Sequence, residues 1–160
     1  MKNLDILIIY AIITLTYCKH IFIKGKYDFL LLCVLYLVMG TLYENREFPN
    51  NNNEYSKKYK LLMSFLYQIT ALIFLKHQFM CEKYDYVVMA IAYLVAGIIK
   101  YNLMCEKNSG ELSMLQKINV FADICTALIF GKNVVVNEPF DYVLLALSYG
   151  TYGVTEYLLM

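Results

Sequence analysis

Residues 19–40 read KHIFIKGKYDFLLLCVLYLVMG, and residues 76–97 read KHQFMCEKYDYVVMAIAYLVAG. Both stretches begin with Lys-His, contain Lys-Tyr-Asp, and end in Tyr-Leu-Val followed by Gly. A weaker third copy, KNVVVNEPFDYVLLALSYGTYG, occupies residues 132–153 and keeps the first Lys, the Asp, the Tyr and the last Gly. Because a repeat of this length is one supersecondary unit, the sequence predicts three tandem helical hairpins. We place them at approximately residues 3–46, 58–104 and 111–160 of one all-α domain.

Within these repeats the apolar segments predict six helices, and two polar stretches predict the longer connections. The connections are expected at residues 44–58 and 106–110, where turn-forming residues gather. No stretch alternates with a period of two for long enough to indicate a sheet. The helices are expected at residues 4–22, 28–43, 59–79, 85–103, 111–132 and 141–160.

The composition indicates a membrane protein. The chain is 60% hydrophobic and 17% charged, against about 45–50% and about 25% in an ordinary soluble domain. The uncharged stretches 29–43, 61–75, 86–99 and 142–155 are each shorter than the roughly 20 residues that a spanning helix needs. They nevertheless lack the polar face of a soluble surface helix, and aromatic and lysine side chains at their ends can extend them to the membrane surface. We expect six transmembrane helices in the plasma membrane.

With six spans, both termini lie on one face of the membrane, and the position of each Lys or Arg in the sequence assigns it to one of the two faces. Eight lie on the face of the termini and six on the other, which predicts cytoplasmic termini. A net charge of +1 gives no electrostatic reason to expect a nucleic-acid partner. The first face holds Lys2, Arg46, Lys57, Lys58, Lys60, Lys100, Lys107 and Lys117, and the second Lys19, Lys24, Lys26, Lys76, Lys83 and Lys132.

The repeated Asp and Lys residues have two interpretations. Each Asp precedes the second helix of a hairpin, where an N-cap carboxylate accepts a backbone N–H; each Lys lies in the last turn of the first helix, where it opposes the helix dipole. Alternatively, the six side chains form a ring that gates ions at one membrane face. The residues are Asp28, Asp85, Asp141, Lys19, Lys76 and Lys132.

The repeated tyrosines also have two interpretations. Each is followed four residues later by a glycine, so both lie on one helix face. Glycine permits close approach of a neighbouring helix, and the tyrosine hydroxyl can reach a partner across the interface. The alternative is a pathway lined by tyrosines. The pairs are Tyr36 with Gly40, Tyr93 with Gly97, and Tyr149 with Gly153.

Asp123 stands apart, because it falls in the middle of an expected helix where the other repeats have Tyr10 and Tyr67. An ionisable side chain at bilayer depth is costly and suggests function. Its expected partners are Lys117, Gln68 or the hydroxyls of the two tyrosines; the alternative is a structural, hydrogen-bonded Asp.

Three further ionisable residues are expected near the membrane surface. His20 and His77 follow repeated lysines, so we expect solvated or interfacial side chains, with a proton relay as the alternative. Glu156 near the end of the last helix is expected to be interfacial.

The sequence gives little support to an enzyme or a metal protein. Five cysteines and two histidines form no disulfide framework or zinc motif, so no metal or cofactor is expected. Catalytic signatures are missing, so an enzyme acting on lipid is only the third of three hypotheses for the function.

The first hypothesis is a membrane protein that passes an ion or small solute, alone or as a homo-oligomer. The second is a non-conducting membrane partner or scaffold that docks another protein through residues 44–58.

Three two-helix repeats are similar in layout to the mitochondrial carriers. Because each repeat has an even number of spans, the copies share one orientation and are related by an axis along the membrane normal. Residues 139–144 read PFDYVL and end in Leu where the carrier signature requires a basic residue. We therefore assign no family from the sequence.

Overall fold

The computed structural model describes residues 4–46 and 54–159 of the chain. These residues form helices and connections without a strand, as the sequence predicts. The helices are α1 (Leu4–Phe22), α2 (Asp28–Asn45), α3 (Glu54–Phe79), α4 (Lys83–Lys107), α5 (Met114–Val135) and α6 (Phe140–Leu159).

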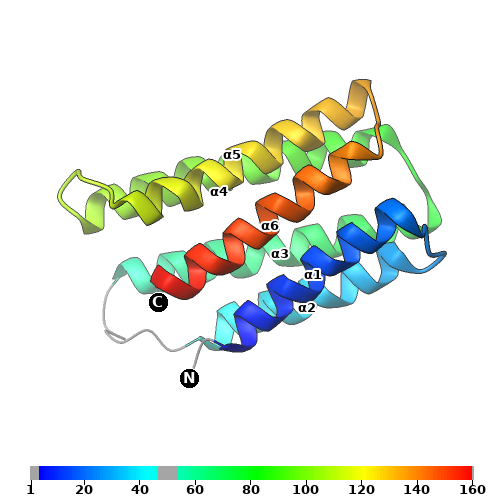
Figure 1. The fold of residues 1–160 in the computed structure, drawn as a ribbon. Coiled ribbons are helices and arrows are strands. Elements are labelled where there is room, and N and C mark those ends of the chain that lie inside the picture. Colours follow the sequence, from blue (N-terminus) through cyan, green and yellow to red (C-terminus); the bar gives the residue numbers. More distant parts are fainter. Residues whose placement is uncertain (1–3, 47–53, 160) are drawn as a thin grey trace.

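The six helices form a closed ring in chain order (Figure 1). Among the described residues, each helix packs against the helix before it and the helix after it, and α6 packs against α1. The most extensive interfaces are α2–α3, α4–α5 and α6–α1, which join different predicted hairpins. The connections 23–27, 80–82 and 136–139 lie at one end of the ring, and both termini lie toward the other. We call these the connection end and the terminus end.

Glycines permit the close approach at the three extensive interfaces. A Cβ added to Gly153 on α6 would lie 2.7 Å from Cβ of Tyr10 on α1. At Gly97 on α4, the added Cβ would lie 3.1 Å from Cβ of Asp123 on α5, and at Gly40 on α2 it would lie 3.3 Å from a backbone oxygen of α3. The second residue of each predicted Tyr/Gly pair therefore lies where a neighbouring helix comes closest.

The outside of the ring carries many large apolar side chains. Five helices, α1 to α5, are long and apolar enough to cross a membrane. The sixth helix, α6, is not among these five, because its hydroxyl side chains, two acidic residues and two glycines lower its hydropathy. Large apolar side chains that are more than half exposed include Leu15, Leu61, Phe65, Leu72, Phe121, Leu128 and Leu147. This surface is compatible with a membrane location.

Several expected helix boundaries were wrong, including the end of α4, expected at residue 103 and observed at Lys107, and two helix starts. Helix α3 begins at Glu54, not residue 59, because Glu54 opposes the positive end of the dipole and forms a 2.9 Å ion pair with Lys58 one turn later. Helix α5 begins at Met114, not residue 111, because Ser113 and Gln116 form a capping box. The rest of the predicted 44–58 loop, residues 47–53, lies outside the described residues.

Candidate functional site

A fully buried ion pair links α4 to α5. Nζ of Lys100 lies 2.7 Å from Oδ2 of Asp123, and neither side chain is exposed. Lys100 was expected among the cations of one membrane face, whereas its side chain is buried between helices. The spacing of residues in the sequence could have predicted the burial of Lys100. Lys100 follows Tyr93 by seven residues and Gly97 by three, which puts all three on one helix face. The predicted alternatives for the partner of Asp123 did not include this lysine.

An asparagine extends the ion pair toward α6. Oδ1 of Asn119 accepts a hydrogen bond from Lys100 Nζ at 2.9 Å. Its amide nitrogen donates to Oγ1 of Thr155 at 2.8 Å and to Oε1 of Glu156 at 3.1 Å. Asn119 and Thr155 are buried, so both ends of the amide are satisfied away from water.

Glu156 forms the second charged centre of this network. Its carboxylate accepts from Nη1 of Arg46 at 3.4 Å and from the hydroxyl of Tyr59. Lys100 Nζ lies 4.0 Å away. Glu156 and Arg46 are both buried inside the protein, whereas Arg46 was counted among the cations of one membrane face. Removing Arg46 and Lys100 from the cation count leaves six on each face, so charge no longer distinguishes the two orientations.

Tyrosine hydroxyls lie beside the charged centre. The Tyr10 hydroxyl hydrogen-bonds to the hydroxyl of Tyr43 at 3.1 Å and to that of Tyr67. The ring of Tyr152 stacks on that of Tyr10, and its hydroxyl accepts from Lys100 Nζ at 3.5 Å. Tyr10 and Tyr67, two of the partners expected for Asp123, therefore bond to each other.

The remaining expected partners of Asp123 point elsewhere. Lys117 is exposed on α5. Gln68 is exposed on α3, where its amide donates to the Ser64 hydroxyl at 3.2 Å.

The three repeated tyrosines meet in the middle of the ring. The hydroxyls of Tyr93 and Tyr149 are hydrogen-bonded, and the ring centroids of Tyr36 and Tyr149 lie 5.7 Å apart. Tyr17 stacks on Tyr149 at 5.4 Å and hydrogen-bonds to Tyr36 at 3.0 Å. All four side chains are buried. Their packed rings fill the interior where they meet.

At the connection end, each repeated Lys pairs with the repeated Asp of the same predicted hairpin. The lysine side chains are about half exposed, whereas the aspartates are buried. Each carboxylate also accepts the backbone N–H of the residue three before it. The N-cap assignment is therefore corrected: each Asp lies inside the first turn and reaches back, as the acid of a capping box does. The Nζ–Oδ1 distances are 2.6 Å for Lys19–Asp28, 2.7 Å for Lys76–Asp85 and 2.8 Å for Lys132–Asp141.

Two histidines complete this end. Nδ1 of His20 lies 2.6 Å from Asp28, and Nδ1 of His77 lies 3.0 Å from Asp85. The ring of Phe29 lies 5.3 Å from the first imidazole and 4.8 Å from the second. Both histidines are buried, so the solvated positions expected for them were wrong. The cause is the hairpin itself, which returns the Asp to the histidine eight residues earlier.

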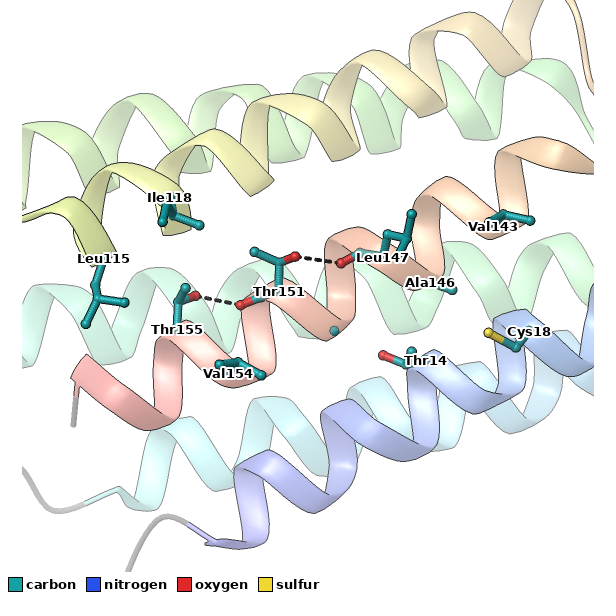
Figure 2. Close-up of a pocket in the computed structure, with 11 residues that line it drawn as sticks. Thr14, Cys18, Leu115, Ile118, Val143, Ala146, Leu147, Thr151, Val154 and Thr155 are labelled. Atoms are coloured by element: carbon teal, nitrogen blue, oxygen red, sulfur yellow. Dashed lines mark hydrogen bonds between the residues drawn. The ribbon is translucent and has the colours of Figure 1, made fainter.

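An outer groove of about 580 Å³ runs between α1, α5 and α6 (Figure 2). Its walls are largely apolar, with hydroxyls contributed by Thr14, Thr151 and Thr155. Thr155 Oγ1 donates to the backbone oxygen of Thr151 at 2.8 Å, as Figure 2 shows, and accepts from Asn119. Thr155 therefore both lines this groove and bonds to the buried polar network.

Comparison with known proteins finds no matching family model, no matching curated protein and no matching solved structure. Within the described part of the chain, no group of three or more His, Cys, Asp or Glu side chains could hold a metal ion. The candidate functional site is the buried network, whose ionisable members are Arg46, Lys100, Asp123 and Glu156.

Proposed function

We propose that this chain is a multi-pass plasma-membrane protein of six spanning helices, built as three tandem hairpins, that passes a small cation through the interior of its ring. The apolar lengths of α1 to α5 support the membrane placement. Helix α6 lies between α5 and α1 in the ring, so it spans with them if they span. Its polar residues are tolerated because several of them, including Tyr149, Thr155 and Glu156, are buried against its neighbours.

The observation that carries this proposal is the pairing of Lys100 between two carboxylates. Its ammonium lies 2.7 Å from Asp123 and 4.0 Å from Glu156. Charges inside a membrane helix are costly and are typical of ion pathways. A cation that enters from the terminus end can take Asp123 as its ligand while the Lys100 ammonium moves to Glu156. The network stays neutral before and after this exchange, apart from the charge of the passing ion.

Passage then requires the tyrosine cluster to open. In this proposal the buried, packed rings of Tyr36, Tyr93 and Tyr149 act as a closed gate beyond the charged centre. The hydroxyl oxygens of these rings are the ligands available to a cation once the rings separate. At the connection end, the three Lys–Asp pairs would form the second barrier.

The test is ion flux into vesicles that contain the purified full chain. H⁺, Na⁺, K⁺ and choline gradients are applied in turn, and the wild type is compared with Asp123→Asn, Lys100→Met and the control Lys117→Gln, which changes an exposed lysine of α5. We expect one or more cations to enter with wild type and control, and entry to fall at least about tenfold in the other two variants. No flux for any cation would contradict the proposal, as would flux that Asp123→Asn leaves unchanged in folded protein.

The alternative, a non-conducting partner subunit or scaffold, stays a prediction from the sequence. It places the contact in residues 44–58, of which residues 47–53 lie outside the described residues. Replacing residues 48–54 by Gly and Ser would then remove a stoichiometric co-purifying protein from the folded chain. A co-purifying partner that survives this replacement would reject that contact.

A further inference from the structure

A second groove lies on the outside of the ring at the terminus end, between α2 and α3, and has a volume of about 350 Å³. Glu44 in the last turn of α2 forms one side. Lys57 and Lys60, three residues apart in the first half of α3, face the same groove because that spacing places them on one helix face. The entrance therefore carries two positive charges and one negative charge.

The groove changes character toward the middle of α3. Beyond the lysines it is lined by the Ser64 hydroxyl and the Gln68 amide, which are hydrogen-bonded to each other at 3.2 Å. Leu61 and Phe65 flank this polar strip and are 73% and 61% exposed. This order matches that of a phospholipid. The charges would face the head group, the hydroxyl and amide groups would face the glycerol backbone, and the apolar surface would face an acyl chain.

We propose that this groove binds one anionic glycerophospholipid, with phosphatidylglycerol as its defining ligand. The phosphate lies between Lys57 and Lys60, a head-group hydroxyl donates to Glu44, and an acyl chain runs over Leu61 and Phe65. The groove's charge of +1 matches the −1 charge of this lipid, whereas phosphatidylcholine is neutral and has no head-group donor for the carboxylate. This inference depends on the membrane placement proposed above but not on the passage of ions.

The chain offers a matched control for the two lysines. Lys58 is adjacent in the sequence but pairs with Glu54 at 2.9 Å and does not line the groove. Lys117 is exposed on α5, in its first turn. The variant Lys57→Gln/Lys60→Gln and the control Lys58→Gln/Lys117→Gln therefore remove the same charge from helices at the same end of the ring.

The experiment measures the melting temperature of the full chain in a non-ionic detergent as short-chain lipid is added. Dioctanoyl-phosphatidylglycerol, dioctanoyl-phosphatidylcholine and glycerol 3-phosphate are titrated separately. We expect the first to raise the melting temperature of the wild type and of the control with similar apparent affinity. The double variant in the groove should bind at least about tenfold more weakly, since each lysine near an anionic head group contributes measurably. The single variant Lys57→Gln, at an exposed position, should lose about threefold and serves if the double variant does not fold.

Three results would overturn the inference. The first is equal affinity of the groove variant and the control for phosphatidylglycerol. The second is an equal response to phosphatidylcholine, which would show that the head-group charge is not recognised. The third is an equal response to glycerol 3-phosphate, which would identify the ligand as a free phosphate. A chain that stays monodisperse without detergent would instead reject the membrane placement, and a failed flux assay would leave this lipid site standing.

Discussion

Lys100 and Asp123 form an ion pair on adjacent helices in which neither side chain is exposed. Such a pair contributes little net stability when it is complete, but removing one partner strands a buried charge. The pair therefore allows a structural role to be separated from a functional one by experiment.

Substituting either partner alone should destabilise the fold. We expect Asp123→Ala or Lys100→Ala to cost about 3–5 kcal/mol, because the remaining buried side chain loses the opposite charge that lies 2.7 Å from it. The apolar pair Lys100→Met/Asp123→Leu should recover most of this loss, as measured by thermal unfolding in detergent. If the pair passes cations, the double variant will fold well and conduct nothing. Recovery of both stability and flux would show that the charges have no part in conduction.

The sequence was sufficient to predict the helices and the residues at the hairpin ends, because these depend on local patterns. Helix α1 was predicted without error in its bounds, and the Asp, Lys and Gly residues picked out by the repeat lie at close contacts. The partner of Asp123 was missed, because Lys100 was treated as a surface cation on composition alone. The buried positions of His20 and His77 depend on how each hairpin folds back, which composition does not reveal.

Replacing Gly153 by Ala should destabilise the packing of α6 against α1. An added Cβ would lie 2.7 Å from Cβ of Tyr10, and neither group is the end of a flexible side chain. We expect Gly153→Ala to cost about 1–3 kcal/mol through overpacking. The control is Gly150→Ala in the same helix, where the nearest side-chain atom would be 3.8 Å away, and thermal unfolding of both variants makes the comparison. Equal melting temperatures would mean that α6 and α1 do not approach as closely as described.

The aspartate of the second Lys–Asp pair should matter more than its lysine. Asp85 is buried and accepts hydrogen bonds from Lys76, from His77 and from the backbone N–H of Glu82. Asp85→Ala leaves a buried imidazole and a backbone donor without this acceptor, which should cost about 1–3 kcal/mol. Lys76→Met should lower the melting temperature less, because the lysine is partly exposed and water can replace it. The reverse order would indicate that the cation, and not the carboxylate, organises this end.

Cysteine labelling tests the orientation that the sequence predicts. Cys81 is exposed in the connection between α3 and α4, whereas Cys105 lies near the end of α4 at the opposite end of the ring. If the termini are cytoplasmic, a membrane-impermeant maleimide applied to intact cells should label a variant that retains only Cys81. A variant that retains only Cys105 should be labelled after permeabilisation and not before. A variant that retains only Cys33, which is buried, is the control and should resist labelling in both conditions. Labelling of Cys105 and not Cys81 in intact cells would reverse the orientation, and equal labelling of both would contradict a single membrane orientation.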